Sequence, residues 1–136
     1  MKKISFSIIV FSTSVAHAAC QLPNTVEGKD FVMAVSNLYS PNNPMAGNVY
    51  KMEFHSDGTY NYRILNNGNY YSERYKYQRV GSSIGIISSE EMFGSTHAKY
   101  TLTLMCDNAY SGVYFYQKSD GVSGGRSNIS RYFSLN

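Results

Sequence analysis

The sequence predicts an all-β domain, an antiparallel up-and-down β-barrel of about eight strands. Three observations lead to this prediction. From residue 29 onward, apolar and polar residues alternate with the period of half-buried strands, and Asn, Asp and Gly turn sequences interrupt the alternation. A third observation is that no stretch has a convincing helical period. An antiparallel meander of this size tends to close on itself, because closure removes the exposed strand edges that invite aggregation.

The expected strands run from one turn to the next. In residues 48–55 the side chains of Tyr50, Met52 and Phe54 share a face, and the Asp57-Gly58 step that follows suits the positive φ angles of a tight hairpin. After the first stretch from residue 29, the expected strands are residues 48–55, 59–65, 69–80, 84–87, 99–106, 113–117 and 129–135.

One short departure from strand structure is expected. In residues 88–93, serines precede Glu90 and Glu91 as they do at a helix start, which predicts one helical turn at most. Residues 41–44 combine Pro and Asn and predict a loop.

Residues 1–19 have the pattern of a secretory signal peptide. Lys2 and Lys3 form a positive start, residues 4–15 are mainly apolar, and Ala16-His17-Ala18 is the small-x-small pattern that signal peptidase recognises. We expect cleavage after residue 18 or 19, which leaves residues 20–136 as a single domain in the periplasm or outside the cell. The apolar stretch is too short to span a bilayer.

Cys20 keeps a second interpretation of the leader open. A lipoprotein signal also ends just before a cysteine, which then carries the lipid. Such signals usually have Leu where this chain has His17. Ordinary cleavage is therefore favoured, and lipidation of Cys20 is the alternative.

Cys20 and Cys106 are the two cysteines of the chain. In an oxidising compartment, two cysteines in one small domain most simply pair, so we expect a disulfide between them. On the chain-entropy model, a loop of this length is worth about 4 kcal/mol at most. The bond would tie the start of the domain to an interior strand.

The charge balance argues against some classes of partner. Removal of Lys2 and Lys3 lowers the formal net charge from +3 to +1, leaving ten basic and nine acidic residues. Nucleic acids and anionic membranes require clustered cations, so neither is expected as a partner. The one basic cluster, Arg74, Lys76 and Arg79, is interpreted as the solvated face of a strand.

The strand and turn pattern extends over most of residues 20–136. It is carried by Gly28-Lys29-Asp30-Phe31, Tyr50-x-x-x-Phe54-x-x-x-Gly58-x-Tyr60-x-Tyr62, Tyr100-x-Leu102-x-Leu104, Ser111-Gly112-Val113-Tyr114 and Tyr132-Phe133-Ser134-Leu135. In this pattern the sequence resembles exported calycin-like, lipocalin-type β-barrel domains. The resemblance implies a closed barrel.

The motifs that could carry chemistry are incomplete. Residues 81–85 match G-x-S-x-G around Ser83, but a nucleophile elbow needs a strand-to-helix turn in a much larger α/β fold. His55 and His97 do not have metal-ligand spacing, and the carboxylates of Glu90 and Glu91 are expected to point apart. The Gly-rich residues 121–126 lack the rest of a phosphate-binding pattern. The sequence therefore predicts no enzyme, no metal and no cofactor.

Tyrosine is the most unusual feature of the composition. The chain has 13 Tyr and no Trp, and all the tyrosines follow the leader. Cross-strand aromatic pairs account for many of them. Tyrosines on an outer sheet face are typical of protein interfaces, whereas inward ones can line a barrel mouth. The candidate binding aromatics are Tyr70, Tyr71, Tyr75, Tyr77, Tyr114 and Tyr116.

These observations lead to three functional hypotheses. The first is an exported, non-enzymatic binding protein that recognises a protein partner, as an inhibitor or an immunity-type factor does. The alternative is a carrier of a small apolar or amphipathic ligand in the barrel interior. The third is a hydrolase that uses Ser83. The deciding question is whether the barrel is hollow, because a packed interior leaves only surfaces to act.

Overall fold

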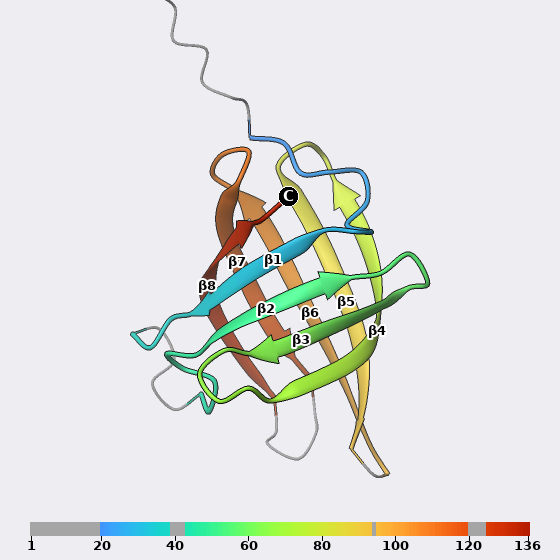
Figure 1. Cartoon of the computed structure of the whole chain (residues 1–136), viewed down its shortest axis with the longest axis vertical. Coiled ribbons are helices and arrows are strands. Elements are labelled where there is room, and N and C mark those ends of the chain that lie inside the picture. The colour runs from blue at the N-terminus through green and yellow to red at the C-terminus, as the bar shows by residue number, and fades with distance from the viewer. Residues whose placement is uncertain (1–19, 39–42, 94, 120–124) are drawn as a thin grey trace, which may run out of the picture.

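A computed structural model describes residues 20–38, 43–93, 95–119 and 125–136, and these form a closed barrel of eight antiparallel strands (Figure 1). Each strand pairs with its neighbour in the sequence, and β8 closes the barrel on β1. The strands are β1 (Asp30–Val35), β2 (Val49–Phe54), β3 (Thr59–Ile64), β4 (Tyr70–Val80), β5 (Ile84–Phe93), β6 (Thr96–Cys106), β7 (Ser111–Lys118) and β8 (Arg126–Ser134). The predicted all-β barrel is confirmed. The predicted leader, residues 1–19, lies outside the described residues, as do parts of the predicted loop at 41–44 and of the Gly-rich residues 121–126.

The helical turn expected in residues 88–93 is wrong, because β5 continues through this segment. The backbone of β5 is paired on both sides: Glu90 lies opposite Arg74 on β4 and opposite Lys99 on β6. Ser89 is one of the serines that resembled a helix start in the sequence. Its hydroxyl donates instead to the carbonyl oxygen of Arg74 at 2.6 Å. Pairing with two strands satisfies the backbone groups that a single helical turn would leave without partners.

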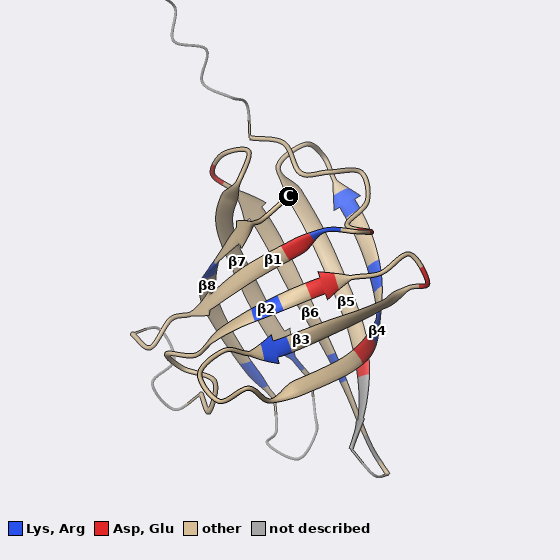
Figure 2. Ribbon diagram, in the orientation of Figure 1, with Lys and Arg blue, Asp and Glu red and all other residues tan. Residues whose placement is uncertain are grey.

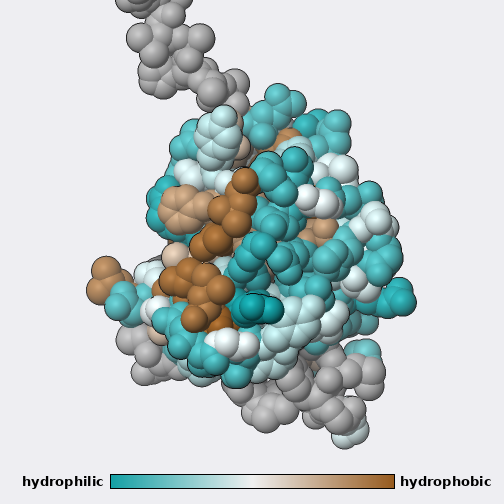
Figure 3. Space-filling view, in the orientation of Figure 1, coloured by the Kyte–Doolittle hydropathy of each residue, from teal (hydrophilic) through white to brown (hydrophobic). Residues whose placement is uncertain are grey.

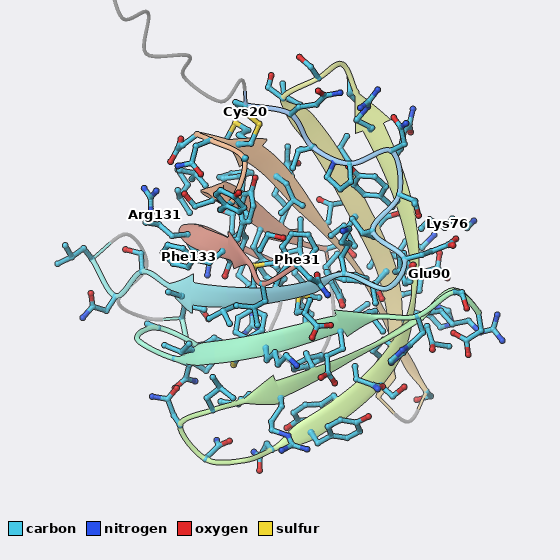
Figure 4. The ribbon with its side chains drawn as sticks, turned by 45° about the horizontal axis from the view of Figure 1, so that its top comes forward. Cys20, Phe31, Lys76, Glu90, Arg131 and Phe133 are labelled. Atoms are coloured by element: carbon cyan, nitrogen blue, oxygen red, sulfur yellow. A yellow bond between two sulfur atoms is a disulfide. The ribbon has the colours of Figure 1, made fainter. Side chains whose placement is uncertain are left out.

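The apolar and polar residues that alternate in the sequence point to the inside and the outside of the barrel. In β1 and β2 every second side chain is buried. Figure 4 shows Phe31 directed into the barrel, while Arg131 and Phe133 on β8 point outward. The β2–β3 hairpin follows the expected chemistry, since Gly58 has a φ of 79° and Asp57 accepts hydrogen bonds from the backbone and hydroxyl of Thr59.

One end of the barrel is covered by residues 20–29, which we call the plug (Figure 1). The side chains of Leu22 and Val26 in the plug are fully buried. The backbone N–H of Leu22 donates to the carbonyl oxygen of Ser82 at 2.8 Å. Cys20 and Cys106 form the expected disulfide at this end, with their Cα atoms 5.7 Å apart (Figure 4).

Aromatic rings fill the half of the barrel beneath the plug. Phe31 meets Phe54 edge to face with ring centroids 5.8 Å apart, and it meets Tyr132 in the same way at 5.9 Å. Phe54 in turn stacks on Tyr60 at 5.6 Å. These four rings are almost completely buried, so this half of the interior is packed.

Basic and acidic residues are interspersed along the strands and turns of the barrel (Figure 2). Lys51 on β2 binds Asp30 on β1 at 2.9 Å and Glu53 on its own strand at 2.6 Å. The described residues include no helix of the length and apolar character needed to cross a membrane.

Candidate functional site

The end of the barrel opposite the plug has a cavity of about 90 Å³, which we call the mouth. It lies where β1 and β7 end and where β2 and β8 begin. Its lining residues come from six strands and from the segment that precedes β2. They are Val35, Asn43, Met45, Tyr50, Met52, Tyr62, Tyr100, Leu102, Tyr114, Tyr116, Arg126 and Asn128.

Five tyrosines form most of the wall of the mouth. The hydroxyls of Tyr50 and Tyr114 lie 3.0 Å apart and share a hydrogen bond across the barrel. The rings of Tyr100 and Tyr116 have centroids 5.7 Å apart, and the ring of Tyr62 meets that of Tyr50 edge to face at 6.1 Å. The rings and their hydroxyls together make the wall an amphipathic surface.

Burial favours the neutral form of the phenols of Tyr50 and Tyr100 at the mouth. Burial raises the pKa of Tyr50 and of Tyr100 well above the ordinary value for tyrosine. For Tyr50, the neighbouring Tyr114 adds to this increase in pKa. These two tyrosines therefore offer neutral hydroxyls, which can donate and accept hydrogen bonds.

Two polar side chains on β8 complete the mouth. Arg126 and Asn128 are two positions apart on one strand, so both point to the same face of the sheet. Asn128 is 3% exposed, and its Oδ1 has no hydrogen-bond partner. The Nε of Arg126 is also buried without a partner, and its guanidinium lies over the ring of Tyr116 at 5.8 Å.

Leaving a buried polar atom without a partner costs about 1–3 kcal/mol. The hydroxyls of Tyr60 and Tyr132 also have no partner, but neither residue lines the mouth. Among the residues that the structure describes, only Arg126 and Asn128 combine such an atom with a place in the lining of the cavity. A ligand in the mouth could supply both missing partners.

The structure separates the six tyrosines predicted as candidate binding residues. Tyr114 and Tyr116 line the mouth. Tyr71 lies at the edge of this region, where it stacks on the mouth residue Tyr62 at 4.8 Å and keeps 36% of its surface exposed. Tyr70 points outward and is 51% exposed.

Tyr75 and Tyr77 have structural roles away from the mouth. The hydroxyl of Tyr77 donates to the carbonyl oxygen of Pro23 in the plug at 2.9 Å, and that of Tyr75 donates to the carbonyl oxygen of His55. Both rings pack against the buried core.

Sequence reasoning missed Arg126 and Asn128, because the last strand was expected to begin at residue 129. The strand begins at Arg126. A signal was present, since Arg126, Asn128, Ser130 and Tyr132 continue the alternation back toward the glycines. Tyr50, Tyr62 and Tyr100 fall within expected strands but were not assigned to a site.

The G-x-S-x-G segment is a turn between two strands. Ser83 is exposed in the β4–β5 turn, where Gly81 has a φ of 78°. Gly85 lies under the ring of Tyr77, and a Cβ at this position would be 2.7 Å from the hydroxyl oxygen of that tyrosine. Packing against Tyr77 thus explains why position 85 holds a glycine. The segment does not form the strand-to-helix turn of a nucleophile elbow.

The other sequence candidates are dispersed. His55 shares a hydrogen bond of 2.8 Å with Asn61, and His97 is exposed in β6 rather than in the loop where it was expected. Within the described part of the chain, no three His, Cys, Asp or Glu side chains form a group that could hold a metal ion.

The fold places the protein in a broad structural class, the closed eight-stranded antiparallel β-barrels, consistent with the calycin-like resemblance. No family model and no curated protein matches the chain. Among solved structures, the barrel is similar to one from Burkholderia vietnamiensis described as a "putative beta-lactamase". The TM-score is 0.53 and the identity 17%, with 81% of this chain and 95% of the other covered. This likeness concerns the fold alone.

Proposed function

We propose that this protein is an exported binding protein that holds a small amphipathic molecule in the mouth of its barrel. The observation that supports this proposal best is the cavity at one end of an otherwise packed barrel, lined by tyrosines and by two polar side chains with unpaired atoms. Concave, largely apolar sites with a few converging polar groups are typical of small-molecule binding.

The volume of the mouth limits the size of the ligand. Sites for drug-sized ligands usually measure roughly 300–1,000 Å³. At about 90 Å³, this cavity is suited to a single ring or a short chain. A long lipid tail has no space beneath it, because Phe31, Phe54 and Tyr60 occupy the other half of the barrel. The proposal is thus a narrower form of the carrier hypothesis.

The test is a titration of the isotope-labelled protein, followed by NMR, with single-ring probes such as phenylacetate and 2-phenylethanol. We expect saturable shift changes concentrated at the residues that line the mouth. Leu102, which lines the mouth and is 2% exposed, offers a variant that fills the cavity, Leu102→Phe. The matched control is Leu135→Phe, since Leu135 is 56% exposed on the outside.

Leu102→Phe should abolish the shift changes, and Leu135→Phe should leave them intact. The proposal fails if no probe perturbs the mouth residues at millimolar concentration. It also fails if the changes spread over the outer surface and persist in Leu102→Phe.

Recognition of a protein partner remains the second candidate, and it would use a different surface. Apolar side chains gather on the outside over β1 and β8 (Figure 3). Leu38, Phe133 and Leu135 are 90%, 43% and 56% exposed, and Phe133 lies opposite Val32 in the sheet. Such surfaces are enriched at protein interfaces.

A pull-down from periplasmic extract with matched variants discriminates between the two candidates. If this surface binds a partner, Phe133→Glu should lose a protein that the wild type and Leu102→Phe both retain. Equal retention by Phe133→Glu and the wild type would count against this surface.

A further inference from the structure

The polar pair at the mouth, Arg126 and Asn128, indicates the chemical class of the ligand. This inference rests on the proposed function and deepens it. The two side chains differ in what they lack: Arg126 has a donor without an acceptor, and Asn128 has an acceptor without a donor. A ligand that satisfies both must itself accept at one point and donate at a neighbouring point.

The charge of Arg126 selects the accepting group. A guanidinium keeps its positive charge at any physiological pH. Arg126 forms no ion pair with another described residue. The ion pairs identified in the described part of the chain are Lys51 with Asp30 and Glu53, Lys99 with Glu90, and Arg131 with Asp107. The stacking on Tyr116 holds the planar group in place but leaves its Nε without an acceptor. Carboxylates and phosphates both match the planar fork of N–H donors that a guanidinium presents, and the carboxylate is the smaller of the two, as a cavity of about 90 Å³ requires.

Asn128 adds a second requirement beside the first. Its amide oxygen is enclosed, since the side chain is 3% exposed, and it lies on the strand position opposite Tyr116. A carboxylate without an adjacent donor would place its own oxygens near Oδ1 and could donate no hydrogen bond to it. A hydroxyl or N–H next to the carboxylate would donate to Oδ1 and remove the penalty of burial.

The remaining wall fits an uncharged apolar body. The rings of Tyr100 and Tyr116 and the side chains of Met52 and Leu102 supply apolar contact, and the Tyr50–Tyr114 hydroxyl pair is already hydrogen-bonded. We propose that the mouth binds a small carboxylic acid that carries a hydroxyl or N–H beside its carboxylate, on a body no larger than one ring. The carboxylate binds Arg126, the adjacent donor binds Asn128, and the ring lies between the tyrosines.

Three probes of nearly equal size test separately the carboxylate and the adjacent hydrogen-bond donor of the proposed ligand. Mandelate has the carboxylate and an adjacent hydroxyl, phenylacetate has the carboxylate alone, and 2-phenylethanol has no charge. Calorimetric or NMR titration at neutral pH should rank the affinities in that order. For ligands of this size we expect mandelate to bind with a Kd of roughly 0.1–1 mM.

The variants assign each preference to one side chain. Arg126→Gln should weaken mandelate and phenylacetate by about tenfold or more, as expected for loss of a charged hydrogen bond, and leave 2-phenylethanol unchanged. Asn128→Leu should abolish the preference for mandelate over phenylacetate. Arg63→Gln is the matched control, because Arg63 also lies 5.8 Å from a tyrosine ring, that of Tyr70, but is exposed on the outside. It should change none of the affinities.

The outcomes distinguish this inference from the function on which it rests. If 2-phenylethanol binds as tightly as the acids, or if Arg126→Gln binds the acids as the wild type does, the carboxylate assignment is overturned and the mouth remains a binding site. Equal affinity for mandelate and phenylacetate overturns the role of Asn128. If no probe perturbs the mouth, the inference and the proposed function fail together. Arg126→Lys, which keeps the charge but not the fork, should retain part of the affinity and serves as a second variant if Arg126→Gln is unstable.

Discussion

Gly112 on β7 shows how closely the interior is packed. A Cβ at this position would collide with the backbone oxygen of Met105 and would lie 2.7 Å from both the Cα of Cys106 and the ring of Tyr132. Two of these three neighbours are backbone atoms of the paired strand β6, which cannot move without disrupting the sheet. The absence of a side chain here is therefore what allows the ring of Tyr132 to lie across the strand.

Gly112→Ala should destabilise the protein by about 3 kcal/mol, the upper end of the usual cost of overpacking. Chemical denaturation measures this as a lower midpoint at an unchanged slope. Gly125→Ala is the control, because a Cβ there would meet its nearest neighbour at an ordinary 3.5 Å. A similar loss of stability in both variants would contradict this account of Gly112.

The buried tyrosines predict how stability depends on pH. Burial raises the pKa of Tyr50 and Tyr100, and it raises that of Tyr132 to about 12. The unfolded value is about 10. Because the folded state favours the protonated phenol, this contribution to stability is complete below pH 10 and is lost as the pH rises from 10 through 12.

Alkaline titration should therefore unfold the protein cooperatively above pH 10, with the late phenolate absorbance appearing together with loss of the near-ultraviolet circular dichroism signal. The urea-unfolded protein is the reference and should titrate in one step near pH 10. The account is wrong if all the tyrosines of the folded protein ionise in one step at the unfolded value.

At the scale of elements, the strands were predictable where alternation is uninterrupted and local. The expected strands at residues 48–55 and 99–106 anticipate β2 and most of β6, because one buried face leaves a strict period of two in the sequence. The prediction of a helical turn in residues 88–93 was wrong. Serine and glutamate favour a helix start locally, but pairing with β4 and β6 makes this segment a strand. Such long-range pairing leaves no mark in a window of six residues.

The candidate site was predictable only in part, for a related reason. Tyr114 and Tyr116 were found because β7 alternates clearly. The sequence also suggested Tyr77, but its hydroxyl is used to bind Pro23 of the plug, 54 positions away in the chain. Which inward tyrosine lines a cavity and which supports the plug depends on the closure of the barrel, and no local pattern encodes that.

The plug depends on the disulfide as well as on its buried side chains. Cys20 and Cys106 are 86 positions apart, so their bond restricts the unfolded chain strongly. The double variant Cys20→Ser with Cys106→Ser should lower the free energy of unfolding by about 2–4 kcal/mol in chemical denaturation. Adding reductant to the wild type should have the same effect, and adding it to the double variant should have none. An unchanged midpoint after confirmed reduction would contradict a stabilising role.

For the whole molecule, the proposed function implies that the two ends of the barrel have different tasks, stability at the plug and binding at the mouth. Leu22 lies in the plug and is 4% exposed, and it does not line the mouth. Leu22→Ala should therefore lower the free energy of unfolding by about 2–4 kcal/mol, the usual cost of truncating a buried leucine, while mandelate affinity stays within twofold of the wild type. Leu102→Phe should instead abolish mandelate binding and should lower the free energy of unfolding less than Leu22→Ala does. Denaturation curves and titrations of the two variants under one set of conditions measure both effects. If Leu22→Ala weakened binding as much as Leu102→Phe does, the two ends would be coupled through the aromatic core, and the division of tasks would be wrong.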